Sequence, residues 1–302
     1  FLMKFSMQGA GAQEGGEFFT PPSLVQLIVN FIQPDHGIIH DPACGSGGMF
    51  VQTAHFIKSH GNQKVNEAIK VYGTEYKSNT AKLAKMNLAI HGIEGKIANN
   101  NSFYSDPHEL YGKCDFVMAN PPFNVDKVDA KNKFLAEDKR LPFGAPLTGK
   151  GTIGNANYLW IQYFMSYLND TGRAGFVMAS SATDAGNAEK RIREELVKTG
   201  NVDCIVSIGN NFFYTRSLPC HVWFFDKGAS APLSNQGADI ERSRNDRKVK
   251  MPAVLEGKVQ PEEYRKKTIL MIDARNVYRK VTTTINDFSE EQLEGLTAIM
   301  AR

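Results

Sequence analysis

A cluster of glycines between an expected strand and an expected helix constrains the fold of this chain more than any other feature. Residues 38–50 read Ile-Ile-His-Asp-Pro-Ala-Cys-Gly-Ser-Gly-Gly-Met-Phe. The β-branched start predicts a strand, and the apolar residues 49–57 predict a helix. Between them, Gly45, Gly47 and Gly48 allow the positive φ angles of a tight turn and let a ligand approach the backbone. The stretch predicts a ligand-binding turn in an α/β fold. A turn that only joins core elements is the alternative.

Two details of this turn restrict its ligand. Phe50 stands where a dinucleotide-binding loop has its third glycine, so an NAD site is not expected. Asp41, just before the turn, suits an ammonium group and would repel a pyrophosphate. Together with Pro42 and Ala43, the turn is expected to hold a compact, partly cationic nucleoside.

A second motif follows another apolar stretch. Residues 116–119, which predict a strand, lead directly into Asn120-Pro121-Pro122-Phe123. The two prolines fix a rigid backbone whose carbonyls cannot join a helix. We expect the Asn120 oxygen and the Pro121 carbonyl to accept the N–H groups of a planar amine while Phe123 stacks on its ring. A proline-capped strand followed by a core phenylalanine is the alternative.

The two motifs resemble those of the S-adenosylmethionine-dependent amino-methyltransferases, in particular the methylation (modification) subunit of type I restriction-modification systems. A third stretch of that family, Gly16-Glu17-Phe18-Phe19-Thr20-Pro21-Pro22, precedes the glycine turn here too. The resemblance covers nearly the whole chain. It implies that Phe18, Phe19 and Thr20 lie beside the methionine end of S-adenosylmethionine. Alternatively, the two phenylalanines form a hydrophobic staple against a helix that Thr20 caps.

Further cofactor contacts are expected at the next strand ends. Residues 68–73 predict a strand that leads to Glu75, and an acid at this place in such a fold accepts hydrogen bonds from both ribose hydroxyls. The resemblance places Asn101 and Ser102 at the adenine, where the family often has an aspartate. The amide of Asn101 can still accept a hydrogen bond but brings no charge. A simple turn is the alternative at this position.

The order of elements predicts an α/β fold with a doubly wound, mostly parallel, Rossmann-like sheet and helices on both faces. The resemblance implies a seven-stranded methyltransferase sheet in which residues 220–226 form the reversed strand. The other expected strands are residues 38–40, 68–73, 96–98, 115–119, 176–179 and 202–208, with one more strand at residues 268–272. The expected helices are residues 21–31, 49–57, 79–91, 157–168 and 188–198, and a last helix that Ser289 and Gln292 cap reciprocally.

Two regions differ in composition from the rest of the chain. Residues 1–16 are expected to be a flexible lead-in, left after a missing N-terminal helical domain, and residues 17–302 to be the methyltransferase domain. Within it, the polar insertion at residues 229–267 has nine Lys and Arg against six Asp and Glu. A solvated linker is favoured there over a nucleic-acid patch.

Residues 124–156 show no convincing periodicity and have six Lys and Arg against four Asp and Glu. We expect a mobile flap that closes over DNA and a flipped base. A solvated loop without a partner is the alternative for any single lysine. The candidate phosphate contacts are Lys127, Lys131, Lys133 and Arg140. For the aromatic cluster Phe212, Phe213 and Tyr214, core packing is favoured over a role in the base pocket.

Composition excludes several classes of protein. With 302 residues, 42% of them hydrophobic, the chain can bury a full core, and its net charge of +3 is only mildly basic. Four scattered cysteines, without a Cys-x-x-Cys pair or a His cluster, predict reduced thiols and no metal site. No apolar run is long enough for a membrane span, and no signal peptide is visible. We expect a cytoplasmic protein.

The expected activity is methyl transfer from S-adenosylmethionine to N6 of a flipped adenine in double-stranded DNA. The resemblance also implies partners: a separate specificity subunit, with two methylating subunits to one specificity subunit, and a restriction (nuclease) subunit. Cytosine N4 and the glutamine side chain of release factors are alternative acceptors, because similar motifs serve them. A non-catalytic scaffold that keeps the cofactor fold is the more distant alternative.

Overall fold

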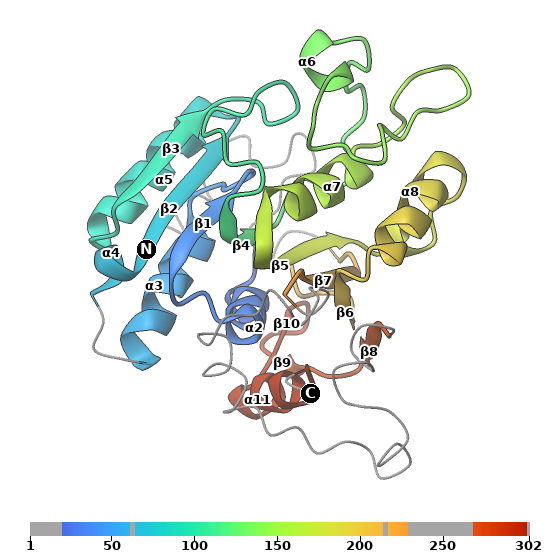
Figure 1. The fold of residues 1–302 in the computed structure, drawn as a ribbon. Helices are drawn as coiled ribbons and strands as arrows, with labels where there is room; N and C mark the ends of the chain where they lie inside the picture. The colour runs from blue at the N-terminus through green and yellow to red at the C-terminus, as the bar shows by residue number, and fades with distance from the viewer. Residues whose placement is uncertain (1–19, 61–63, 214–216, 229–267, 301–302) are drawn as a thin grey trace.

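The fold is built on one large mixed sheet (Figure 1). The computed structural model describes residues 20–60, 64–213, 217–228 and 268–300. Over these residues the sheet has eight strands in the order β3-β2-β1-β4-β5-β7-β6-β8, so the expected count of seven is wrong. The additional strand is the one expected at residues 268–272, which joins the sheet edge beside β6 as β8. The strands are β1 (Gly37–Asp41), β2 (Ile69–Glu75), β3 (Gly95–Asn99), β4 (Cys114–Ala119), β5 (Leu168–Ala179), β6 (Val202–Ile208), β7 (Cys220–Asp226) and β8 (Leu270–Ala274).

The direction of the strands agrees with the expected fold. All neighbouring pairs run parallel except those that involve β7, which is antiparallel to both β5 and β6. The doubly wound sheet with one reversed strand is thereby confirmed. A short hairpin of β9 (Arg279–Lys280) and β10 (Asn286–Asp287) follows β8.

Helices cover both faces of the sheet, and each face has its own hydrophobic core. Alternate residues of one strand enter different cores: Val222 and Phe224 pack on one face, Trp223 and Phe225 on the other, as the period of two requires. The first face is covered by α2 (Pro22–Ile32), α3 (Gly48–His60), α5 (Ser78–Ile90) and α11 (Glu290–Met300), and the second by α7 (Asn157–Tyr167) and α8 (Asn187–Lys198). Short turns of helix, α4 (Val65–Ala68) and the 3-10 helix η1 (Ser180–Thr183), lie in connections.

Two helix ends test the expected capping. The reciprocal cap of α11 is confirmed: Ser289 N donates to Gln292 Oε1 at 2.9 Å, and Gln292 N donates to Ser289 Oγ at 3.2 Å. The expected cap of α2 is wrong, because Pro21 is the N-cap residue and no side chain caps this helix. Thr20 lies one residue further out. Pro22, at the first helical position, has no N–H, so this end of the helix has one unsatisfied donor fewer.

Candidate active site

The two motifs meet where the order of the sheet changes direction. From β1 the chain proceeds outward to β2 and β3 on one side, and β4 returns to the other side of β1. Both β2 and β4 run parallel to β1, so Asp41, Glu75 and Asn120 lie at or just beyond the same carboxyl edge. Ligands of open α/β sheets bind at such a switch point.

The glycine turn, residues 45–48, has the predicted conformation at two of its three glycines, and the third, Gly48, begins α3. Gly45 and Gly47 have φ angles of 53° and 79°, which side chains rarely adopt. Gly47 N donates to Cys44 O at 2.8 Å, and Asn87 Nδ2 of α5 donates to Ser46 O at 2.9 Å. A Cβ added at Gly45 would meet no atom of the described residues within 4 Å. The backbone at this residue therefore borders open space in which a ligand can lie.

Two buried acids stand beside this turn. One Asp41 oxygen accepts from Ala43 N at 2.9 Å. The two Glu75 oxygens accept from Gly45 N at 3.1 Å and from Lys77 N at 2.7 Å. Burial, and then the negative charge of Glu75, raise the pKa of Asp41 to about 8. Asp41 is therefore mostly protonated at neutral pH, and a cation beside it favours the ionised form.

Residues 101–106, the adenine loop after the role that the resemblance implies for Asn101 and Ser102, lie next to the turn. Ser102 Oγ donates to Pro42 O at 2.6 Å, which ties the loop to the residue that follows Asp41. The Asn101 oxygen accepts from Phe103 N at 2.9 Å. The Asn101 side chain thus forms the local turn that was the alternative to an adenine contact. One lone pair of that oxygen can still accept a ligand donor.

The Asn-Pro-Pro-Phe motif directly follows β4. Phe123 is 7% exposed, and its ring meets that of Phe213 edge to face, with centroids 6.1 Å apart. Phe212 and Phe213 are buried, so core packing is confirmed for these two, while Tyr214 lies outside the described residues. Phe213 supports the Phe123 ring from one side.

An amide pair that the sequence did not reveal fixes the end of this motif. Asn124 N donates to Asn157 Oδ1 at 2.9 Å, and Asn157 Nδ2 donates to Asn124 Oδ1 at 2.8 Å. Asn157 is the first residue of α7 and is 1% exposed. Close by, Ala156 N donates to Val125 O at 2.9 Å. The two ends of the flap, residues 124–156, are thereby joined beside Phe123. In the sequence, the only sign that Asn157 joins the ends of the flap is its position as a polar residue at the start of a mostly apolar helix.

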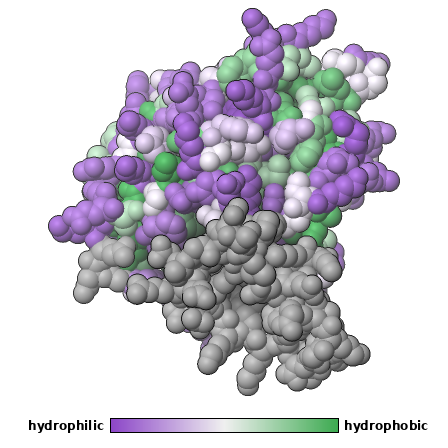
Figure 2. Space-filling model, viewed as in Figure 1, coloured by the Kyte–Doolittle hydropathy of each residue, from purple (hydrophilic) through white to green (hydrophobic). Residues whose placement is uncertain are grey.

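The flap is packed and carries its own short helix, α6 (Lys133–Ala136). Arg140 is 1% exposed and bonded to Asp138, so its expected role as a phosphate contact is wrong. In contrast to Arg140, some apolar side chains of the flap remain at the surface: Phe134 is 39% exposed and Leu147 is 45% exposed. Figure 2 shows hydrophobic side chains reaching the upper surface, in the region of the flap. The flap residues buried against α7 and the adenine loop are Val128, Leu135, Leu141 and Ile153.

Some expected site residues are not placed. Phe18 and Phe19 lie outside the described residues, as does the insertion 229–267, and Thr20 is partly buried just before α2. All four cysteines are buried and unbridged. In the described part of the chain no three His, Cys, Asp or Glu side chains are grouped to hold a metal. None of the helices described there is long and apolar enough to cross a membrane.

Comparison with known families identifies the chain. Residues 1–301 match the family model described as N-6 DNA methylase. The chain belongs to the N-6 DNA methylase family. Among curated members, the methylase subunit of the type I restriction enzyme MjaIX from Methanocaldococcus jannaschii is 35% identical over 98% of this chain and 46% of its own length. The HindI methylase subunit from Haemophilus influenzae is 37% identical over 75% of this chain and 49% of its own length. The chain thus spans about half the length of these family members.

Solved structures share the fold. The methyltransferase subunit of a type I restriction-modification system from Streptococcus thermophilus superposes with a TM-score of 0.73 at 20% identity, over 98% of this chain and 56% of that one. The M protein of the type I enzyme EcoKI gives a TM-score of 0.65 at 21% identity, over 94% of this chain and 54% of that one. The N-6 DNA methylase chain described here therefore has the methyltransferase fold that its motifs predicted.

Proposed function

We propose that this chain is the methyl-transferring part of the modification subunit of a type I restriction-modification system, acting on N6 of adenine in DNA. The observation that carries the proposal is the position of Asn120-Pro121-Pro122-Phe123 beside the glycine turn, at the switch point of the sheet. A grip for an amine and a pocket for a cationic nucleoside thus adjoin. Membership of the N-6 DNA methylase family supports adenine over cytosine.

The open space at Gly45 and the buried acids fit S-adenosylmethionine, whose sulfonium supplies an electrophilic methyl group. Asp41, Pro42, Ala43 and the turn at Gly45 and Gly47 receive the methionine part, together with Phe18, Phe19 and Thr20. Glu75, whose oxygens accept backbone N–H groups from Gly45 and Lys77, takes the ribose hydroxyls in this proposal. Asn101 and Ser102 border the adenine.

The protein contributes to catalysis by positioning. Asn120 Oδ1 and Pro121 O accept the two N–H groups of the target amine, which directs its lone pair at the methyl carbon. Pro122 keeps this backbone rigid, and Phe123 stacks on the flipped base. Bound S-adenosylmethionine would supply the methyl group from its sulfonium and leave as a neutral thioether, and the amine held by Asn120 and Pro121 would lose its extra proton to solvent. A strong general base is not required, because the product ammonium is acidic.

In this proposal, other subunits recognise the DNA sequence that is methylated. We propose a complex of two copies of this protein with one specificity subunit, joined by a restriction subunit for cleavage, in the cytoplasm. The names of its curated relatives, which are methylase subunits of type I restriction enzymes, support a role within a multisubunit enzyme. The ratio of two to one is an expectation from the family resemblance.

The test is methylation of unmethylated DNA with methyl-labelled S-adenosylmethionine, by the chain together with a type I specificity subunit. The digested product should carry label in N6-methyladenosine, and Asn120→Ala should remove it. Label in N4-methylcytosine instead would mean that cytosine is the target base, with the same mechanism. Cofactor binding without label in any nucleoside would contradict the proposal and favour a scaffold.

A further inference from the structure

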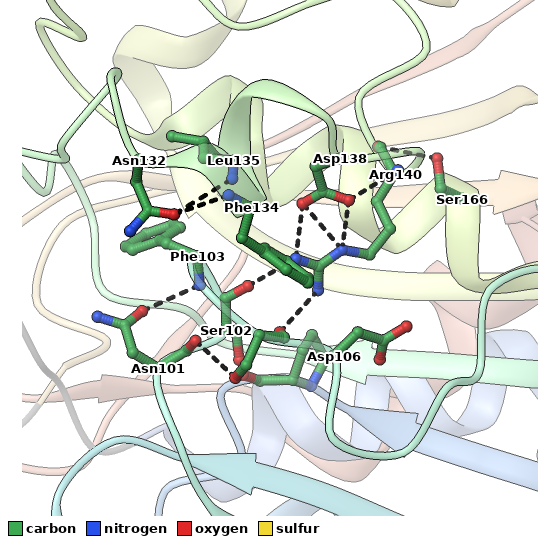
Figure 3. Close-up of polar contacts among 12 residues, drawn as sticks. Asn101, Ser102, Phe103, Asp106, Asn132, Phe134, Leu135, Asp138, Arg140 and Ser166 are labelled. Atoms are coloured by element: carbon green, nitrogen blue, oxygen red, sulfur yellow. Dashed lines mark hydrogen bonds and ion pairs between the residues drawn. The ribbon is translucent and has the colours of Figure 1, made fainter.

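Arg140 lies on the flap with its charged group buried, surrounded by acceptors (Figure 3). Its Nε donates to Asp138 Oδ1 at 2.9 Å, and its Nη2 donates to Asp138 Oδ2 at 2.7 Å. The face of the guanidinium stacks on Tyr163, 4.1 Å from the ring centroid. A buried charge is tolerated only with this degree of pairing. The guanidinium group of Arg140 is therefore held in one position by Asp138 and Tyr163.

The remaining donors of Arg140 reach out of the flap to the adenine loop. Nη2 donates to Ser102 O at 2.8 Å, and Nη1 donates to Ser105 O at 3.3 Å. Nη1 also donates to the Tyr167 hydroxyl, which in turn donates to Asp106 Oδ1 at 3.2 Å. One side chain thus holds three residues of the adenine loop, directly or through Tyr167.

Other contacts extend this connection in both directions. On the cofactor side, Ser102 Oγ bonds to Pro42 O. On the flap side, Asp129 N donates to the Tyr104 hydroxyl at 2.8 Å, and Ser166 Oγ of α7 donates to Arg140 O at 3.0 Å. A continuous set of hydrogen bonds therefore runs from the flap through the adenine loop to the residue after Asp41.

We propose that Arg140 is a positioning residue that couples the flap to the adenine end of the cofactor site. The inference rests on the proposed function, which gives the cofactor its place. With the flap docked, Arg140 holds the backbone of the adenine loop in the shape that receives adenine. By thermodynamic reciprocity, the bound cofactor holds the flap docked. Arginine is needed because its planar fork serves a carboxylate and two carbonyls at once, which lysine cannot do.

Three variants separate coupling from simple support of the fold. Arg140→Lys keeps the charge and loses the fork. Tyr167→Phe removes only the hydroxyl that links Arg140 to Asp106 and keeps the buried ring. The matched control is Arg191→Lys: Arg191 also donates to a flap carbonyl, Phe143 O at 3.2 Å, but has no bond to the adenine loop.

The first measurement is calorimetric binding of S-adenosylhomocysteine to the chain, without DNA or other subunits. We expect about tenfold weaker binding for Arg140→Lys and about threefold weaker binding for Tyr167→Phe. Arg191→Lys should bind as the unchanged protein does. Unchanged affinity in Tyr167→Phe, or an equal loss in Arg191→Lys, would overturn the inference.

The second measurement is hydrogen exchange of the α6 amides with and without S-adenosylhomocysteine. The ligand should slow exchange of these amides in the unchanged protein, and less so in Tyr167→Phe. Equal protection in both would contradict coupling, because a merely structural tyrosine would not alter it. Failure of the unchanged protein to bind the ligand at all would overturn the proposed function itself. Normal methylation with no effect of the variants would overturn only the role of Arg140.

Discussion

Two parts of the candidate site are held in different ways: the cofactor side, which is the glycine turn proposed for S-adenosylmethionine, and the target side, which is the Asn-Pro-Pro-Phe motif proposed for the amine together with the flap. The shape of the glycine turn follows from backbone geometry within a few residues, namely two positive φ angles and a hydrogen bond from Gly47 N to Cys44 O. Side chains of Glu75 and Asn87 add bonds to this backbone from β2 and α5. The target side is fixed by side chains far apart in the sequence, such as Asn124 with Asn157 and Arg140 with Ser102. Substitutions should therefore act locally on the first side and at a distance on the second.

The largest expected effect separates transfer from cofactor binding. Asn120→Ala removes one of the two acceptors for the amine, so we expect methyl transfer to fall by at least about 100-fold. The affinity for S-adenosylhomocysteine should fall far less, since the turn and its acids are unchanged. Single-turnover methylation and calorimetry on the same preparation measure both quantities. Transfer within tenfold of the unchanged protein would remove Asn120 from the catalytic role.

The next effect concerns pH on the cofactor side. Burial and the charge of Glu75 raise the pKa of Asp41 to about 8. Below that pH, a cationic cofactor must displace a proton from the carboxyl group. Affinity for S-adenosylmethionine should then rise by up to about tenfold per pH unit toward pH 8 and level off above it. Calorimetry from pH 6 to 9 tests this, and a flat profile would contradict it.

Asp41→Asn provides the control and a second outcome. The variant should bind more weakly, without the rise toward pH 8. Because the folded-state pKa lies above the ordinary value of 3.8, the stability that this group contributes is present below about pH 4 and lost as the pH rises through 8. At pH 8 the cofactor-free variant should thus be more stable than the unchanged protein, by about 1–3 kcal/mol. Denaturant unfolding at pH 5 and pH 8 measures the difference.

On the target side, Asn157→Ala should act on the distant motif. It removes both bonds to Asn124, leaves buried groups unsatisfied, and should cost about 1–3 kcal/mol of stability. We expect a severalfold loss of transfer with little change in cofactor affinity, because Phe123 loses its fixed neighbour. Asn169→Ala is the matched control: Asn169 Nδ2 bonds to Asp115 Oδ1 at 2.9 Å, away from the motif. If both variants reduced transfer equally, Asn157 would have no special link to the motif.

The same contrast explains which features the sequence predicted. The strands, the turn at Gly45 and the cap at Ser289 each follow from short patterns with a local physical cause, whereas the reversal of β7 was expected from the family resemblance alone. Arg140 was misread because a basic residue in a polar loop is usually solvated, and only the folded chain brings Asp138, Ser102 and Tyr167 around it. Asn157 had no periodic signal at all. The start of α2 was predicted one residue too early, because either of the two successive prolines suits the first position of a helix.

The smallest effect isolates the backbone itself. Gly45 and Gly112 have φ angles of 53° and 66°, and within the described part of the chain a Cβ added to either would meet nothing within 4 Å. Alanine at either position should therefore cost a similar free energy of unfolding, about 1 kcal/mol, from strain alone. Only Gly45→Ala places its methyl group in the space proposed for the cofactor, so only that variant should also weaken binding of S-adenosylhomocysteine. Unfolding by denaturant checks the shared loss, and calorimetry checks the difference. Equal binding by the two variants would mean that the open side of Gly45 does not receive the cofactor, and the glycine turn would then serve the fold alone.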